Sequence, residues 1–177
     1  MKILLNPLII SAFIVTLLLG SVAHLMYGSC QSSKWHYMMQ YYWVPKGLYK
    51  WIPKDHSEAK SYTGQWNTWF QSGAKFSESE MKDGLENGIG TLWFDNGTKY
   101  VESEMKDGLV NGKSTIWHEN GVKWVEGSFK DGEHNGLSVT WNKDGTLNKK
   151  DYYDEKGNFQ KRELFEKGKL VKTEVVE

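Results

Sequence analysis

Polar and apolar side chains alternate along short stretches in the second half of the chain. An extended strand over residues 99–105 would point Tyr100, Glu102 and Glu104 to one side, and Lys99, Val101, Ser103 and Met105 to the other. This period of two residues is typical of a β-strand. No stretch of residues 64–157 carries an apolar stripe at helical spacing, so the pattern predicts strands there.

The same pattern returns every 24 residues. Tryptophans recur at Trp69, Trp93, Trp117 and Trp141, glycines at Gly73, Gly97, Gly121 and Gly145, and other aromatic rings at Phe76, Tyr100 and Trp124. Carboxylates recur at Glu78, Glu102 and Glu126, and turn pairs at Asp83-Gly84, Asp107-Gly108 and Asp131-Gly132. A fixed period of this length predicts an array of similar units, each in contact mainly with its neighbours.

Each unit contains two short runs separated by residues that favour turns. In the unit 88–111, the runs are separated by Asp95-Asn96-Gly97-Thr98, and Asp107-Gly108 ends the second run before Asn111-Gly112 leads into the next unit. Gly97 can adopt the positive φ that a hairpin turn needs. We therefore expect tandem antiparallel β-hairpins in a single twisted sheet, an all-β fold with strands near 89–94, 99–105, 113–118 and 123–129.

These patterns divide the chain into an N-terminal hydrophobic helix (1–30), an aromatic and basic stem (31–63), the repeats (64–157) and capping strands (158–177). The repeat units are 64–87, 88–111, 112–135 and 136–157. In the last unit Lys156-Gly157 comes one residue later than Asp131-Gly132 does in the third. Terminal repeats are often atypical because they cap the array. The capping strands are expected at Phe159–Phe165 and Leu170–Val176.

The repeats resemble MORN repeats. The resemblance depends on Gly90-Thr91-Leu92-Trp93-Phe94-Asp95-Asn96-Gly97 and on Phe129-Lys130-Asp131-Gly132-Glu133-His134-Asn135-Gly136, and it covers residues 64–157. The segment between Gly97 and Gly108 is one residue longer than in the common MORN unit. In this respect the chain is more similar to the variant MORN repeats of bacterial proteins, some of which are labelled antitoxin-like. The resemblance implies a hairpin array and leaves the function open, because MORN arrays serve several purposes.

The N-terminal segment contains a largely apolar run, Leu8–Tyr27, of 20 residues. As a helix it would span about 30 Å, enough for the hydrocarbon of a bilayer. Three interpretations remain open: an uncleaved signal anchor, a signal peptide cleaved near Ser21-Val22-Ala23, and lipidation at Cys30. Each places the repeats on or across a membrane. Lys2 precedes the run and favours a single-pass protein with its repeats on the extracytoplasmic side.

The stem mixes Trp and Tyr with Lys over residues 34–54. That composition is typical of a membrane–water interface, with lysines facing anionic headgroups, although the stem could equally be a degenerate first repeat. Residues 1–63 carry a net charge of +4, whereas the next three units together carry −5. An acidic array argues against nucleic acid as a partner, because phosphates require clustered Lys or Arg.

The candidate catalytic residues form no recognisable constellation. The repeating glutamates would all share one environment, whereas an acid–base pair needs two different environments. The five histidines, His24, His36, His56, His118 and His134, show no zinc-ligand spacing. The single cysteine, Cys30, excludes an intrachain disulfide and has no evident catalytic partner. We therefore expect neither enzymatic activity, nor a cofactor, nor a bound metal.

The aromatic columns are the most promising binding residues. We expect the Trp column (Trp69, Trp93, Trp117, Trp141) to hold the array together by stacking between units, and the turn glycines (Gly73, Gly97, Gly121, Gly145) to be structural. The other column, Phe76, Tyr100 and Trp124, is the predicted partner-binding strip. The expected function is a membrane-tethered scaffold that binds a protein. The alternatives are lipid binding by the repeats and antitoxin-like inhibition of a partner enzyme, the latter implied only by the resemblance.

Overall fold

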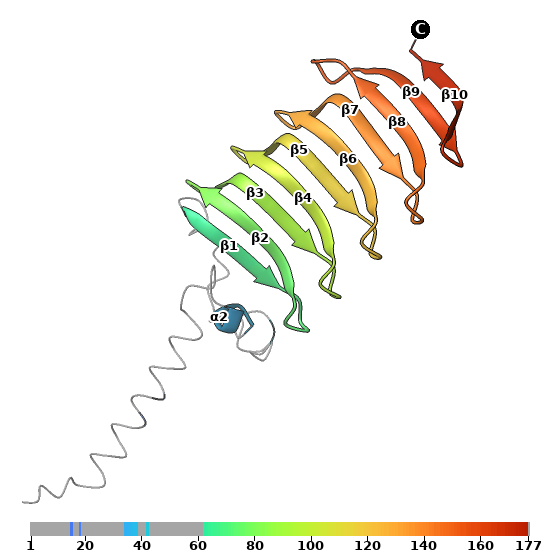
Figure 1. Cartoon of the computed structure of the whole chain (residues 1–177). Helices are drawn as coiled ribbons and strands as arrows, with labels where there is room; N and C mark the ends of the chain where they lie inside the picture. The colour runs from blue at the N-terminus through green and yellow to red at the C-terminus, as the bar shows by residue number, and fades with distance from the viewer. Residues whose placement is uncertain (1–14, 16–17, 19–33, 39–41, 43–61, 177) are drawn as a thin grey trace, which may run out of the picture. The chain divides into compact units, whose positions relative to one another are not determined.

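The computed structural model describes residues 62–176 continuously, together with Val15, Leu18, Lys34–Met38 and Tyr42 (Figure 1). The chain forms two compact units, Met1–Asp55 and His56–Glu177. In the first unit a short helix, α2, spans Lys34–Met38, and the rings of Tyr37 and Tyr42 meet edge to face at 6.1 Å. The predicted 1–30 helix, Cys30 and most of the stem lie outside the described residues. In the described part of the chain, no helix is long and apolar enough to cross a membrane.

The second unit is one antiparallel sheet in which every strand pairs with the next along the chain (Figure 1). Its ten strands are β1 (Gly64–Trp69), β2 (Lys75–Lys82), β3 (Leu85–Trp93), β4 (Lys99–Lys106), β5 (Leu109–Trp117), β6 (Lys123–Lys130), β7 (Glu133–Trp141), β8 (Leu147–Tyr153), β9 (Phe159–Glu166) and β10 (Lys169–Val175). The expected hairpin array with its 24-residue pitch is confirmed, as are the two C-terminal strands.

The first strand of each unit begins earlier than expected. Leu85 and Leu109 directly follow the Asp-Gly turns, and Asn111-Gly112 lies inside β5 rather than in a connection. The reason is the compactness of the turn: Asp107 has φ 51° and Gly108 φ 81°, so both central residues are left-handed. That is the signature of a two-residue type I′ hairpin, which returns the chain to the ladder at once.

The second kind of turn is longer and joins the two strands within a unit. The Gly97 N–H donates to the Phe94 carbonyl at 2.9 Å, and the Phe94 N–H donates to the Thr98 carbonyl at 2.8 Å. The side chain of Asn96 accepts the Thr98 N–H at 2.8 Å. The expected positive φ of the turn glycines is confirmed at Gly73, Gly97, Gly121 and Gly145.

The type of turn between β8 and β9 explains why Gly157 comes one residue late in the fourth unit. Where the other units have a two-residue Asp-Gly turn, the chain between β8 and β9 uses the longer type, with the Gly157 N–H donating to the Asp154 carbonyl at 3.1 Å. The Asp154 carboxylate accepts the backbone N–H groups of Lys156 and Asn158 at 2.8 and 2.9 Å. Gly157 therefore comes late because it belongs to a different turn.

The register assigns the side chains to two faces of the sheet. One face, the glutamate face, has across its middle Asn67, Glu78, Thr91, Glu102, Thr115, Glu126, Val139, Lys150, Glu163 and Thr173. The opposite face, the serine face, has Trp66, Ser79, Gly90, Ser103, Ser114, Gly127, Ser138, Asp151, Arg162 and Glu174. Both rows cross every strand, so each unit contributes equivalent positions to each face.

In the second strand of each unit the expected alternation fails at one position. Leu92 pairs with Val101, but Trp93 pairs with Lys99, so Tyr100 is an extra residue in the second strand. This β-bulge puts Lys99 on the glutamate face, where it forms an ion pair with Glu102. The expectation that Lys99 shares a side with Val101 was wrong, and alternation no longer assigns a side to Tyr100.

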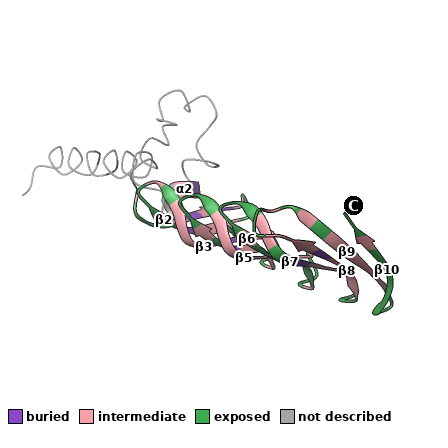
Figure 2. Ribbon diagram, turned by 90° about the horizontal axis from the view of Figure 1, so that it is seen from above, coloured by how far each residue is buried: buried purple, intermediate pink, exposed green. Residues whose placement is uncertain are grey.

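The sheet is a single layer without a closed hydrophobic core. None of the large side chains in the described residues is completely buried. The buried positions of the sheet are mainly small polar residues of the two middle rows, such as Thr115 and Ser103. Figure 2 shows the strands mostly in the colours of intermediate and exposed residues, with little purple. Among the tryptophans of the repeating column, Trp69 is buried and the others are half-buried. Large apolar surface is therefore left at the edges and on both faces.

Candidate binding surface

Tryptophans and lysines alternate along one row of the glutamate face, next to the long turns. Trp93 pairs with Lys99 across β3 and β4, and the Lys99 ammonium lies over the ring of Trp117 at 5.3 Å from its centroid. Lys75 lies in the same way over Trp93 at 5.5 Å, and Lys123 over Trp141 at 5.9 Å. Successive units are therefore joined by ring-to-ammonium contacts, each worth about 0.5–1 kcal/mol at an exposed site. We had expected ring-on-ring stacking; in this row a lysine lies between the rings.

Each lysine of this row also pairs with a glutamate of its own strand. The pairs are Lys75 with Glu78, Lys99 with Glu102, and Lys123 with Glu126. Glu126 has a second partner, Lys113, at 3.1 Å. The hydrogen bond from Lys123 lowers the pKa of Glu126 and outweighs its partial burial. These pairs therefore bring opposite charges together in each of the first three units.

A shallow hollow of about 210 Å³ opens on this face over β3 to β6. Its lining residues are Ile89, Glu102, Ser103, Glu104, Lys113, Thr115, Trp117, Lys123 and Glu126. Side chains of both charges surround the apolar surface of Trp117 and Ile89. Among the residues that the structure describes, no three His, Cys, Asp or Glu side chains come together to hold a metal. The hollow therefore offers contact area with polar anchoring rather than a reaction centre.

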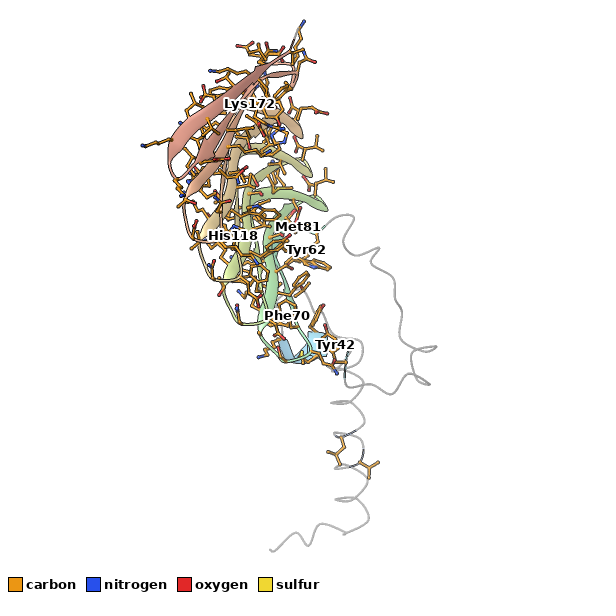
Figure 3. All side chains as sticks on the ribbon, turned by 90° about the vertical axis from the view of Figure 1, so that its right-hand side faces the viewer. Tyr42, Tyr62, Phe70, Met81, His118 and Lys172 are labelled. Carbon is orange, nitrogen blue, oxygen red and sulfur yellow. The ribbon has the colours of Figure 1, made fainter. Side chains whose placement is uncertain are left out.

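The predicted strip residues each contact a ring across the long turn of their unit. The ring centroids of Phe70 and Phe76 are 4.9 Å apart, and those of Phe94 and Tyr100 are 4.8 Å apart. In the third unit His118 stacks on Trp124 at 5.5 Å. We call these three pairs the aromatic edge; Phe70 and His118 are labelled in Figure 3. Phe76 is 40% exposed and Trp124 42%, whereas Tyr100 is half-buried.

The first member of each pair is not among the residues predicted from the sequence. Phe70, Phe94 and His118 directly follow a tryptophan of the repeating column, so the 24-residue period already marked their position. In later hairpins both members of the pair are polar. Asn148 donates a hydrogen bond to Asn142 at 2.8 Å, and Gln160 donates one to Asp154 at 3.2 Å. The aromatic edge therefore belongs to the first three units.

The serine face has aromatic side chains towards the C-terminal end. The ring of His134 lies between Phe129 and Tyr153, with centroid distances of 4.4 and 4.5 Å. Next to this stack, Arg162 holds the buried carboxylate of Asp151 through two hydrogen bonds of 2.5 and 3.2 Å. These groups lie across β6 to β9 and tie the last hairpins together.

The fold is distantly similar to a solved structure described as "Crystal Structure of TarM", with 20% sequence identity and a TM-score of 0.36. The match covers 73% of this chain and 22% of the TarM chain. No protein-family model matches the sequence, and no curated protein matches it.

Proposed function

We propose that this chain is a MORN-like, non-catalytic scaffold that binds a protein partner through the aromatic edge. The observation that carries the proposal is the exposure of Phe76 and Trp124 on a sheet whose described residues have no covering layer. Burying exposed rings of this size is the main driving force of most protein association.

The surroundings of the aromatic edge favour a protein over a small molecule. Binding hot spots are rich in aromatic residues and are surrounded by polar groups that exclude water. Here the exposed rings follow the paired lysines in sequence: Trp124 comes directly after Lys123, which pairs with Glu126. A second hollow, of about 380 Å³, lies beside Trp124's partner His118 and is lined also by Glu119, Asn120 and Lys143. Such shallow hollows suit the side chains of a partner protein.

Replacing Trp124 with Ala tests the proposal, and the fourth unit supplies a matched control. Asn148 occupies the same place in the repeat as Trp124 but has no ring. A partner is first identified by copurification with the full-length chain, and its affinity is then measured by calorimetry. Trp124→Ala should weaken binding by about fivefold or more, since a hot-spot ring contributes more than about 1 kcal/mol. Asn148→Ala should leave the affinity unchanged.

The stability of the same variants separates binding from folding. Trp117→Ala should lower the melting temperature more than Trp124→Ala, because the Trp117 ring contacts Lys99 of the neighbouring unit. Equal affinities for Trp124→Ala and Asn148→Ala would contradict a binding role for the aromatic edge.

The proposed scaffold is tethered to a membrane through residues 1–30, with the repeats on the extracytoplasmic side. The support is the apolar run of the sequence and the charge difference between +4 before residue 64 and −5 over the next three units. The full chain should therefore sediment with membranes, whereas the unit 56–177 should not bind anionic vesicles. Salt-sensitive vesicle binding by 56–177 would instead favour the alternative of a lipid-binding repeat array.

A further inference from the structure

Among the strands that the structure describes, β10 lies at one edge of the sheet. Lys172 marks this end of the sheet in Figure 3, far from Tyr62 at the other end. Within the described part of the chain β10 pairs only with β9, and its side chains Leu170, Val171 and Val175 are exposed by 53%, 53% and 67%. Soluble proteins usually protect such an edge, because its free N–H and C=O groups can pair with another strand.

The free backbone groups of β10 can be assigned. Val176 donates its N–H inward to the Gln160 carbonyl at 3.1 Å. Inward and outward groups alternate along an antiparallel strand, so the N–H and C=O of Thr173 and Val175 point away from β9. The register shift in this pair lies between Leu170 and Lys172, which leaves the segment 172–176 regular. This segment offers two evenly spaced residues for a new antiparallel ladder.

The sequence of β10 is complementary to itself in one antiparallel register. If two copies meet with Thr173 on a two-fold axis, Lys172 of each copy lies opposite Glu174 of the other. In this register the two Thr173 residues form a hydrogen-bonded pair, as their outward groups require. Opposite charges directly across a ladder are favourable, as are pairs of β-branched residues.

The neighbouring registers are unfavourable. Placing Lys172 on the axis sets the two Lys172 ammoniums opposite each other, and placing Glu174 there sets carboxylate against carboxylate. Like charges directly opposite destabilise a strand pair. In the isolated chain Lys172 and Glu174 pair with each other at 2.7 Å, with side chains 63% and 39% exposed. Both charged groups are therefore accessible to a second copy.

We propose that two copies of this chain associate through β10, edge to edge and antiparallel, with Thr173 on the two-fold axis. The two sheets then continue into one another, and the aromatic edges of both copies become part of one assembly. Because the interface is a symmetric pair of identical strands, it closes after two copies. A single strand pair buries little area, so the association is weak and depends on concentration.

Disulfide trapping in the full-length chain tests the register. In a Cys30→Ser background, one chain carries Lys172→Cys and a differently tagged chain carries Glu174→Cys. The proposed register brings these two Cα atoms to about 4.5 Å, within the range for a disulfide. Two Lys172→Cys residues would be about 7–8 Å apart, beyond that range. Mild oxidation should therefore give about fivefold or more mixed dimer than either homodimer.

A Lys113→Cys variant is the control for disulfides that form by random collision between chains. Lys113 is exposed and lies on β5, in the interior of the sheet. The dimer yield of this variant defines the background. A mixed dimer no more abundant than this background, or an excess of either homodimer, would overturn the proposal. A ladder of higher oligomers would also overturn it, since it would indicate an open-ended contact between unlike edges.

Proline substitutions separate association from folding. Thr173→Pro removes an outward N–H that the β9–β10 pair does not use, so it should abolish the mixed dimer while far-ultraviolet circular dichroism stays unchanged. Glu174→Pro removes an inward N–H and should also loosen β10 from β9. Charge reversal gives an independent check: Lys172→Glu alone should weaken association, and adding Glu174→Lys should restore it. A trapped dimer that survives Thr173→Pro would contradict the proposed ladder.

Discussion

At the scale of single residues, glycines have two distinct roles in the array. Gly97 has φ 83° with no atom within 4 Å of a Cβ built at that position, so only its backbone conformation requires glycine. Gly112 has φ 126°, and a Cβ there would lie 2.9 Å from the Cβ of Glu104. Glu104 therefore lies over Gly112, and the same arrangement joins Glu80 to Gly88. The strand glycines make room for a neighbouring glutamate, which the sequence pattern did not indicate.

The boundary between the third and fourth units provides a natural comparison that predicts the size of this effect. Gly136 has φ 84° and no atom within 4 Å of a built Cβ, and its neighbour is Ser128 where the other units have glutamate. Gly136→Ala should cost about 1–2 kcal/mol for the left-handed backbone alone. Gly112→Ala should cost more, because Glu104 must also move.

Urea denaturation of both glycine variants, with and without Glu104→Ser, measures the coupling. Glu104→Ser should bring the cost of Gly112→Ala closer to that of Gly136→Ala. Equal costs for the two glycine variants in the wild-type background would show that Glu104 adapts freely.

At the scale of the elements, Asp151 connects the last hairpins. It lies in β8 with only 5% of its side chain exposed, and it bonds Arg162 of β9 and also Lys149 at 2.7 Å. Burial raises the pKa of this carboxyl, but the hydrogen bonds from Arg162 and Lys149 outweigh it and leave the pKa below its ordinary value. The ionised form is therefore the one that stabilises the fold.

Asp151→Asn should destabilise the C-terminal hairpins by about 1–3 kcal/mol at neutral pH, because Arg162 and Lys149 lose a charged acceptor. A depressed pKa gives stability that is present above the unfolded-state pKa, near 3.9, and is lost as the pH falls through the folded-state value. The difference in melting temperature between wild type and variant should therefore shrink below about pH 4. A difference that does not change between pH 7 and pH 3 would contradict this account.

At the scale of the whole sheet, units contact their neighbours through equivalent groups at the edge formed by the Asp-Gly turns. The Gly108 N–H donates to the Glu86 carbonyl and the Gly132 N–H to the Val110 carbonyl, each at 2.9 Å. Asn87 and Asn111 donate to Asp107 and Asp131, respectively, at 3.1 and 2.9 Å. The stability of such an array is approximately a sum over units and their interfaces.

Deleting residues 88–111 from the full chain should therefore leave a folded, shorter sheet. Asn87 would then precede Gly112, and every contact between units would find an equivalent partner. The variant should keep its β circular dichroism and unfold cooperatively with a smaller urea m-value, because less surface is exposed on unfolding. Deleting only 88–99, half a unit, is the control and should prevent folding. Loss of structure in the whole-unit deletion would show that the units are not interchangeable.

The sequence by itself determined the hairpin array, its period and the turn glycines. These features follow from local strand and turn preferences that are repeated at a fixed spacing. Each unit therefore gave independent support for the same structural prediction. The same period marks the aromatic edge. It gives the predicted strip, of which Phe76 and Trp124 are exposed and Tyr100 is half-buried, and it could also have given Phe70, Phe94 and His118.

Only the tertiary structure decided how neighbouring strands meet. The bulge at Tyr100 turns Lys99 to the glutamate face, where it reaches Trp117 of the next unit. Alternation along one strand cannot reveal this, because a bulge is defined by two residues opposing one on the partner strand. The place of Glu104 over Gly112 has the same origin. Side-chain direction in this sheet is set by register across strands, which the spacing of residues within one strand does not contain.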